Sequence, residues 1–133
     1  MADSIVFTKS EDFALRIIRL CRFLSEKKKE NIISKQIFRS GTSIGANLAE
    51  SVHGVSDGDF INKHAISQKE CEETLYWLRL LKRSDFITEQ QFDDIYKDGT
   101  EIKKLLASII KTMKEKTRAK SRKKDSQLIT HNS

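Results

Sequence analysis

The chain has 133 residues, with 25 Lys and Arg against 19 Asp and Glu, no proline and only five glycines. That length suits one domain with a real core, and so little proline and glycine argues against interrupted β-structure and flexible linkers. A third of the residues are charged, and no apolar run reaches the roughly 18 residues that a membrane span needs.

The first residues show no basic region followed by an apolar core, so we expect no secretory signal and a cytoplasmic location. The two cysteines, Cys21 and Cys71, could form one disulfide in principle. In a chain without an export signal they are expected to stay reduced.

Two helices are predicted in the first half of the chain. After a lead-in over residues 1–8 that is expected to fray, Ser10 is the candidate N-cap of a helix that runs to Lys28. Asn31 is the next candidate cap, and the second helix runs from there to about His53. Their apolar stripes consist of Phe13, Ile17, Leu20 and Leu24, and of Ile33, Ile37, Ile44 and Leu48.

Two further helices are predicted in the second half. Ser56 caps a third helix that ends near Ser84, and Thr88 with Gln91 three residues later resembles a capping box that opens a fourth. Gly99 is expected to bend or loosen the fourth helix. The apolar stripes are Phe60, His64, Ser67, Cys71, Leu75, Leu78 and Leu81, and then Phe92, Ile95, Ile102, Leu105, Leu106, Ile109, Ile110 and Met113.

Four helices joined by short turns predict an all-α fold, an antiparallel up-down-up-down four-helix bundle. We divide the chain into the bundle, residues 1–117, and a basic, polar tail, residues 118–133, which is expected to be disordered or conditionally ordered.

Positive charge is concentrated at the end of the chain. Residues 1–110 carry 17 basic and 17 acidic residues and are neutral, whereas residues 111–124 carry eight basic residues and one acid. Such a segment can neutralise several phosphates in a salt-dependent and largely sequence-blind way, although no aromatic side chains are interleaved for base stacking. The alternatives are a tail that only aids solubility and, less favoured, one that binds an anionic membrane surface. The nucleic-acid-binding candidates are Lys111, Lys114, Lys116, Arg118, Lys120, Arg122, Lys123 and Lys124.

The stretch from Arg39 to Glu50 carries the densest pattern in the chain. Gly41, Gly45 and Ala49 fall four residues apart, so one side of the helix is smooth and suits close approach of another helix. Arg39 and Glu50 lie too far apart to pair and are expected to meet partners on other helices. For Arg39 the candidate partners are Glu70, Glu73 and Tyr76.

Chemical interpretations of these residues are weaker. Gly41-x-x-x-Gly45 has the wrong spacing for a nucleotide-binding P-loop, and no lysine follows it. His64, Cys71 and Cys21 lack the spacing of a metal site, so no metal and no cofactor are expected. A triad of Ser43, His53 and Glu50 has no support from spacing, and we expect no enzyme.

Three blocks resemble one protein family: Arg39-Ser-Gly-Thr-Ser-Ile-Gly-Ala-Asn-Leu-Ala-Glu50, Asp59-Phe60-Ile61-x-Lys63, and Lys69-Glu70-x-Glu72-Glu73-Thr74-Leu75-Tyr76-Trp77-Leu78. The family is that of the bacterial four-helix-bundle proteins encoded in intervening sequences of 23S rRNA genes, also labelled S23 ribosomal proteins. The similarity covers about residues 7–115, and the family is similar to the accessory variability protein of diversity-generating retroelements. The basic tail lies outside the pattern. The motif residues carried over are Arg39, Ser40, Gly41, Ser43, Gly45, Asn47, Glu50, Glu70, Glu73, Leu75, Tyr76 and Trp77.

The resemblance implies a ring-like homopentamer, a role in binding RNA or DNA, and no catalysis. For the retroelement relatives it also implies partnership with a reverse transcriptase. We therefore expect a non-catalytic homo-oligomer, a pentamer, that binds nucleic acid, with RNA favoured, through phosphate contacts. The alternative is a protein-interaction scaffold, such as an accessory subunit of a reverse transcriptase or another RNA enzyme.

Overall fold

Four helices make up nearly all of the fold. The computed structural model describes the backbone of residues 2–54 and 56–132 and the side chains of residues 5–54 and 56–128. In chain order the helices are α1 (Ala2–Lys27), α2 (Ile33–Ser51), α3 (Asp57–Arg83) and α4 (Glu89–Asn132), and the described residues form no strand.

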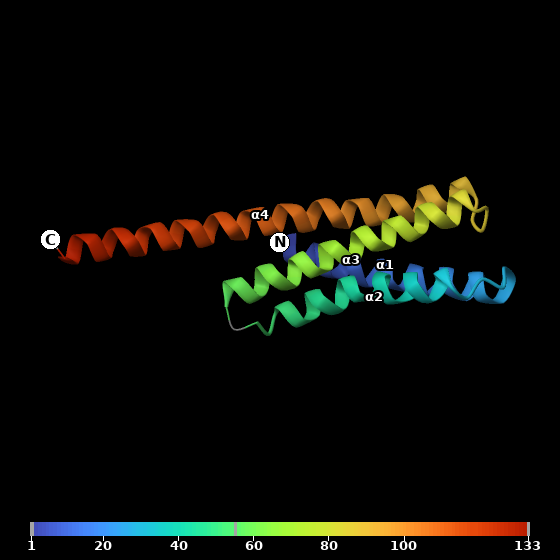
Figure 1. Ribbon diagram of the computed structural model, residues 1–133, viewed down its shortest axis with the longest axis horizontal. Coiled ribbons are helices and arrows are strands. Elements are labelled where there is room, and N and C mark those ends of the chain that lie inside the picture. The colour runs from blue at the N-terminus through green and yellow to red at the C-terminus, as the bar shows by residue number, and fades with distance from the viewer. Residues whose placement is uncertain (1, 55, 133) are drawn as a thin grey trace.

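The helices alternate in direction, and each packs against two neighbours (Figure 1). Within the described residues, α1 and α3 each pack against both α2 and α4, whereas the diagonal pairs make no backbone contact. This arrangement is the antiparallel up-down-up-down bundle that the sequence predicts.

The start of α1 differs from the prediction. The helix is described from Ala2 on, so the expected frayed lead-in is wrong for residues 2–8, as is the N-cap at Ser10; Met1 lies outside the described residues. Val6 is completely buried, and its spacing to Ser10 and Phe13 continues the apolar stripe by one more turn. Burial of that extra turn against the core stabilises the helix before Ser10.

The turn between α1 and α2 is held by Glu30 rather than by Asn31. The Glu30 carboxylate accepts hydrogen bonds from the backbone N–H groups of Ile32 (3.2 Å), Ile33 (3.1 Å) and Ser34 (2.8 Å). Lys29 reverses the chain with a φ of 55°, and the Glu30 N–H donates to the Leu24 carbonyl at 2.9 Å. The first free N–H groups of α2 are thus satisfied by a negative charge at the positive end of the helix dipole.

The caps of α3 and α4 agree with the prediction. Ser56 Oγ accepts a hydrogen bond from the Asp59 N–H at 3.1 Å. Thr88 and Gln91 bond reciprocally, because each backbone N–H donates to the side-chain oxygen of the other, at 2.8 and 3.1 Å. Both motifs are local, so the sequence alone is enough to identify them.

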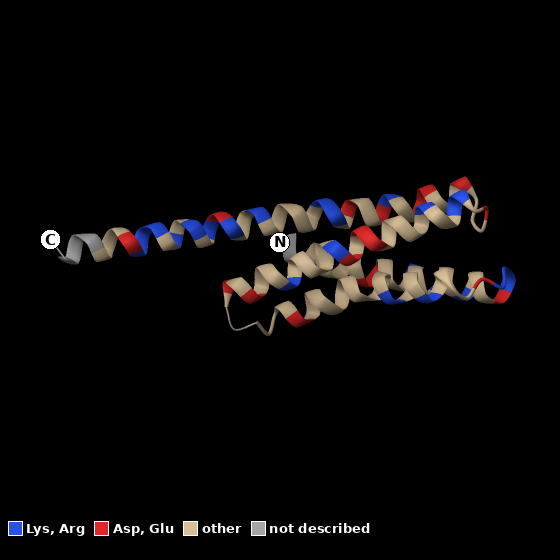
Figure 2. Cartoon of the chain, in the orientation of Figure 1, with Lys and Arg blue, Asp and Glu red and all other residues tan. Residues whose placement is uncertain are grey.

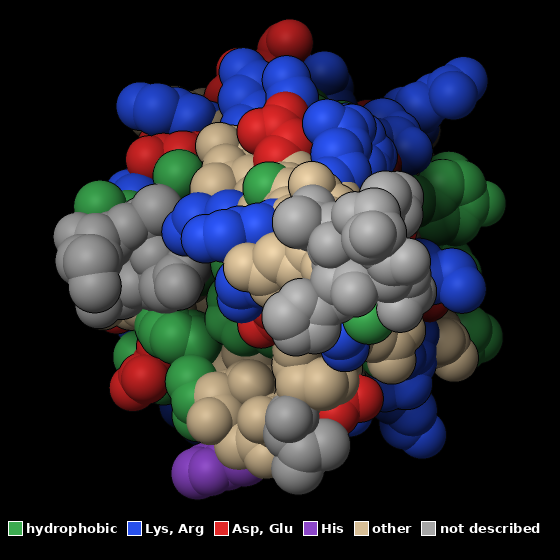
Figure 3. Space-filling model, turned by 90° about the vertical axis from the view of Figure 1, so that its left-hand side faces the viewer, with side chains coloured by type: hydrophobic (Ala, Val, Ile, Leu, Met, Phe, Trp, Pro, Cys, Tyr) green, Lys and Arg blue, Asp and Glu red, His purple; other side chains and the backbone are tan. Residues whose placement is uncertain are grey.

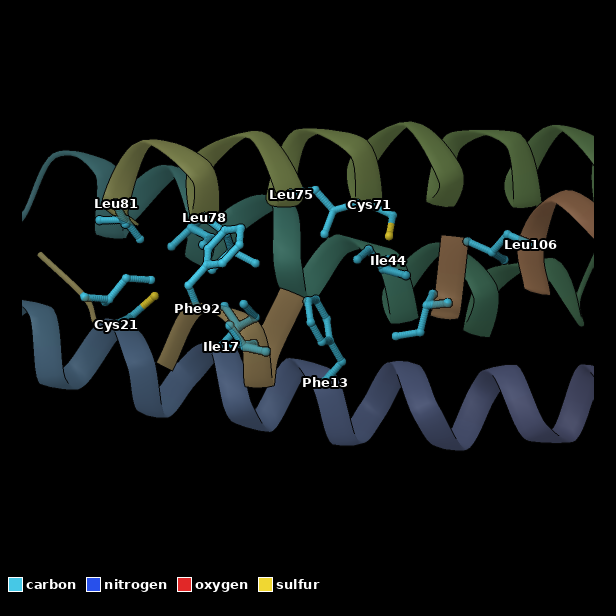
Figure 4. Close-up of a cluster of buried hydrophobic side chains, with 14 of the residues drawn as sticks. Phe13, Ile17, Cys21, Ile44, Cys71, Leu75, Leu78, Leu81, Phe92 and Leu106 are labelled. Atoms are coloured by element: carbon cyan, nitrogen blue, oxygen red, sulfur yellow. The ribbon is translucent and has the colours of Figure 1, made fainter. Parts of the chain in front are cut away.

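The core runs along the bundle axis and draws on all four helices (Figure 4). Phe13 and Ile17 of α1 lie opposite Leu75 and Leu78 of α3, and Ile44 of α2 fills the same layer of side chains. All five are at most 2% exposed, so the apolar stripes found by periodicity are the stripes that pack.

Glycine allows two close approaches inside this core. A Cβ on Gly41 would lie 2.9 Å from both Cγ1 and Cγ2 of Ile17, so α2 and α1 touch there, as the smooth side of α2 predicts. A Cβ on Gly99 would lie 2.7 Å from Leu75 Cδ2 and 3.3 Å from Phe13 Cζ. Gly99 therefore lets α4 approach α3 and α1, and α4 continues through it as a helix.

Candidate nucleic-acid interface

The last third of α4 leaves the bundle. Ile109 and Ile110 are the last buried residues, Met113 and Thr117 are half-buried, and every residue from 118 to 128 is exposed. The row that faces the core continues at helical spacing into Lys120 and Lys124, which replace the apolar side chains. We call residues 111–128 the basic overhang; α4 projects well beyond the other helices in Figure 1.

The overhang is helical rather than a disordered tail. α4 runs unbroken to Asn132 and passes through the predicted domain boundary at residues 117 and 118. The segment is rich in Lys and Arg, which favour helix, and has no Gly or Pro. Because the packed part of α4 already supplies a helical nucleus, each further residue only propagates the helix. Basic side chains near a helix C-terminus also interact favourably with its dipole.

All eight nucleic-acid-binding candidates lie on this overhang and are exposed. Figure 2 shows Lys and Arg positions along much of the protruding part of α4. Among the described residues, one of the eight makes an ion pair: Lys120 Nζ lies 3.0 Å from Asp57 Oδ2 in the first turn of α3. Both groups are largely open to water, so this pair is weak and exchangeable. The other seven cations have no protein counter-charge within ion-pair distance in the part of the chain described.

The basic residues do not share one face. At about 100° per residue, Lys111, Arg118 and Arg122 project within about 40° of one another. Lys116, Lys120 and Lys124 project from the opposite side, centred about 180° away. Seen from the end where α4 protrudes, Lys and Arg side chains lie on several sides of the molecule (Figure 3).

The polar row of α2 forms ion pairs with α3. Arg39 bonds to Glu70, at 3.0 Å, and to Glu73. Trp77 Nε1 also donates to Glu73, at 3.1 Å. The hydrogen bond to Glu73 raises the pKa of Arg39. Burial raises the pKa of Glu73, but the hydrogen bonds from Trp77 and Arg39 lower it by more, so the pKa of Glu73 lies below its ordinary value. The predicted partnership of Arg39 with helix 3 is confirmed for the two glutamates.

Tyr76, the third candidate partner of Arg39, has different neighbours. Its ring lies edge-on to Trp77, with centroids 5.1 Å apart, and the Arg79 guanidinium lies 6.0 Å from its centroid. The side chain is 46% exposed.

The rest of the polar row does not converge on one point. Ser43 Oγ donates to the Arg39 carbonyl and Asn47 Nδ2 to the Ser43 carbonyl, both within α2. Glu50 pairs instead with Lys63 Nζ of α3 at 2.5 Å, so it too meets a partner on another helix. The row therefore fixes α2 against α3 and gathers no set of groups around a substrate-sized space.

Two buried polar contacts between α2 and α3 escape a search for charged residues. Thr74 Oγ1 donates to Ser40 Oγ and Ser67 Oγ to the Ile44 carbonyl, both at 2.8 Å. The three hydroxyl side chains are completely buried. Their spacing within the apolar stripes is the signal that identifies them, because a small hydroxyl at a core position needs a partner on the facing helix.

His64 and the cysteines are core residues. The His64 ring stacks on the ring of Phe60, with the two centroids 3.9 Å apart. Its Nδ1 lies 2.9 Å from the Phe60 carbonyl oxygen, which can only accept, so Nδ1–H is the donor. Both cysteines are free thiols that donate to backbone carbonyls, Cys21 to Ser34 and Cys71 to Gly99, each at 3.2 Å. Burial raises the pKa of Cys21 to about 11 and that of Cys71 to about 12.

A shallow groove lies between α1 and α2 on the outside of the bundle. It has a volume of about 500 Å³, and its floor consists of small residues, including Ala14, Gly45, Ala46 and Ala49. Ser10 lines it as well, and its buried hydroxyl has no hydrogen-bond partner among the described residues. Val52, directly after the end of α2, also lines the groove, and its side chain is 59% exposed.

Together these features define an antiparallel helical bundle with ion-paired helices, an open groove of small residues and an overhanging basic helix. The chain belongs to the family of 23S rRNA-intervening sequence proteins, whose model matches residues 2–108. The matched region ends just before Lys111, so it contains the bundle and not the basic overhang. No helix in the described part of the chain carries an apolar stretch that would reach across a bilayer.

A solved structure agrees with this assignment. The chain is similar to a protein of unknown function from the S23 ribosomal protein family of Bacteroides thetaiotaomicron VPI-5482, with 54% identity and a TM-score of 0.83. The match covers 84% of this chain and 99% of that chain. No curated protein matches the chain.

Proposed function

We propose that this protein is a non-catalytic, cytoplasmic homo-oligomer that binds nucleic acid, RNA in the first place, through phosphate contacts of the basic overhang. The observation that carries the proposal is a helix with eight exposed cations, one of them ion-paired, beyond the end of a neutral bundle. Unpaired and fully hydrated cations gain most from an anionic polymer, because binding releases its condensed counterions. The family's link to 23S rRNA intervening sequences favours RNA as the polymer.

Self-association strengthens such binding. In an oligomer each subunit adds one overhang, so weak phosphate contacts act together at a high effective concentration. We propose the groove between α1 and α2 as the surface that a second copy covers, in a pentamer. Support comes from the small residues that line it, from the exposed side chain of Val52 beside them and from the buried Ser10 hydroxyl that has no partner in the described chain.

Salt-dependent RNA binding tests the first part. Fluorescence anisotropy of a labelled RNA gives the binding constant at each salt concentration. The logarithm of this constant is expected to fall steeply with the logarithm of the salt concentration, with a slope of about −5 to −7 if all eight cations contact phosphates. Changing Lys116, Lys120, Lys123 and Lys124 to Gln keeps the helix propensity and should reduce the slope by about three. The matched control changes four exposed cations of the bundle, Arg22, Lys27, Lys28 and Lys35, to Gln and should leave the slope unchanged.

The competing function is a protein scaffold, for example a subunit of a reverse transcriptase. A specific protein that is recovered with the intact chain after nuclease treatment, together with no RNA binding at low salt, would favour that function over ours.

Native mass measurement tests the assembly. Ala46→Arg puts a long charged side chain into the groove and is expected to shift the protein to monomer. Ala107→Arg, on the exposed side of α4, is the control and should leave the mass unchanged. A wild-type monomer at micromolar concentration would contradict the proposed oligomer.

A further inference from the structure

The overhang carries two opposed basic rows, and this geometry constrains what it can bind. The first row is Lys111, Arg118 and Arg122, and the second is Lys116, Lys120 and Lys124. A single phosphate strand that runs along a straight helix can approach only one side of it. The opposite row would then stay in water and add little to the affinity.

Two phosphate strands would be needed to engage both rows at once. An α-helix with its side chains is about 10–12 Å across. The two walls of a nucleic-acid groove present phosphates on both sides of whatever lies between them. From residue 118 on, every described side chain of the overhang is exposed, and this part of the helix, with Arg118 and Arg122 on one side and Lys120 and Lys124 on the other, matches that environment.

The amino-acid composition of the overhang also favours a duplex over a single strand. Residues 111–128 include no Phe, Tyr or Trp, so the overhang offers no aromatic ring on which an unpaired base could stack. Recognition of single strands depends largely on such stacking. What the overhang offers is charge in a rigid helical arrangement.

The width of the major groove then determines which kind of RNA duplex the overhang can enter. The major groove of regular A-form RNA is deep and narrow and does not admit side chains freely. An internal loop or bulge interrupts the paired helix and lets the strands separate, which opens the groove to the width that an α-helix needs. We propose that the basic overhang inserts into the major groove of an RNA duplex opened by an internal loop, with one row on each phosphate wall. This inference rests on the proposed function and specifies its target.

The second row has a feature that fits insertion. Lys120 holds Asp57 at 3.0 Å in the free protein, at the base of the overhang. Arg122 and Lys124, nearer the tip, have no such partner among the described residues. The tip is therefore free to enter the groove first, and Lys120 can exchange its carboxylate for a phosphate afterwards.

Two matched variants test the two-sided contact. One changes Lys111, Arg118 and Arg122 to Gln, the other Lys116, Lys120 and Lys124 to Gln, and each removes three charges. On an internal-loop RNA duplex, insertion predicts that each variant reduces the salt slope by about two to three and that the effects of the two are similar. A large loss from one row and almost none from the other would overturn the insertion.

The RNA form provides a second readout. Wild-type protein is expected to bind the internal-loop duplex at least fivefold more tightly than a regular duplex or a single strand of the same length. Equal or tighter binding to the single strand would overturn the inference while leaving the proposed function in place. If no RNA form binds at low salt, the proposed function itself fails. Circular dichroism of each variant checks that the overhang remains helical.

Discussion

Gly41 of α2 lies directly against Ile17 of α1, with no room for a side chain between the two helices. A Cβ at position 41 would be 2.9 Å from two Ile17 carbons, whereas one at Gly45, a turn later, would be 3.7 Å from Ser10 Cβ. Ile17 is a buried, branched side chain with little freedom to move aside. The two glycines of one motif therefore have different roles.

The first prediction separates these roles. Gly41→Ala should destabilise the protein by about 1–3 kcal/mol, because the new methyl group overpacks the contact with Ile17. Gly45→Ala meets only ordinary van der Waals distances and should be neutral or stabilising by up to about 1 kcal/mol through helix propensity. Urea unfolding at a fixed protein concentration measures both. Equal effects of the two substitutions would show that the close approach at Gly41 does not exist.

A second prediction concerns Gly99 and Leu75. Gly99→Ala alone should destabilise, because its Cβ would lie 2.7 Å from Leu75 Cδ2. Leu75→Ala alone should cost about 2–5 kcal/mol by leaving a cavity. In the double variant the alanine at position 99 no longer clashes with Leu75 and fills part of that space. The pair should therefore be less destabilised than the sum of the single changes, and strict additivity would contradict the contact.

A third prediction concerns the start of α2. Glu30→Ala removes the acceptor of three backbone N–H bonds from a residue that is only 8% exposed, and should cost about 1–3 kcal/mol. Glu30→Gln keeps an oxygen but not the charge and should cost less. Asn31→Ala is the control: Asn31 makes no cap and only accepts an exposed hydrogen bond from Ser25 Oγ at 2.7 Å, so its loss should change the unfolding free energy by less than about 0.5 kcal/mol.

A fourth prediction follows from the lowered pKa of Glu73. Against the effect of burial, the hydrogen bonds from Trp77 and Arg39 hold the pKa of Glu73 in the folded protein below its ordinary 4.5, so these two contacts contribute their full stability above that pH. The contribution declines as the pH falls below 4.5 and through the folded pKa. The groups are partly exposed, so it stays below about 1 kcal/mol. Glu73→Gln should flatten this part of the stability–pH curve, and an unchanged curve would contradict the assignment.

A fifth prediction concerns the base of the overhang. Asp57→Asn removes the carboxylate that pairs with Lys120 and should tighten RNA binding by up to about fivefold at low salt. Asp59→Asn, in the same first turn of α3, leaves Lys120 paired and controls for the loss of one negative charge. If both variants tighten binding equally, long-range charge and not the Lys120 pair is responsible.

Local signals explain which features could be predicted from sequence. The Ser56 and Thr88 caps lie within three residues of their partners, and the smooth side of α2 is a simple spacing of four. The Glu30 cap depends on the left-handed backbone of Lys29, and lysine has no preference for that conformation from which it could be predicted. The role of Gly99 depends on Leu75 and Phe13 from two other helices, so only the packed bundle reveals it.

The overhang shows a different limit. Apolar periodicity reports packing, and it ends at Met113, where the packing does end. The helix itself does not end there, because its composition favours helix and its nucleus lies in the bundle. The charge of the segment was evident from the sequence, but its arrangement in two opposed rows follows only from the helical backbone. The link between Lys120 and Asp57 spans 63 residues and has no local signature.

The two cysteines can serve as natural probes of how the helices of the bundle move apart. Both thiols have a pKa well above neutrality, but Cys71 is completely buried, whereas Cys21 is 9% exposed and lines a surface groove between α1 and α2. Cys21 bonds to the start of α2 beside the Glu30 turn, whereas Cys71 bonds to Gly99 deep between α3 and α4. The rate at which a thiol reagent modifies Cys71 would thus time the separation of α3 from α4, with the more accessible Cys21 as an internal comparison and without any introduced label.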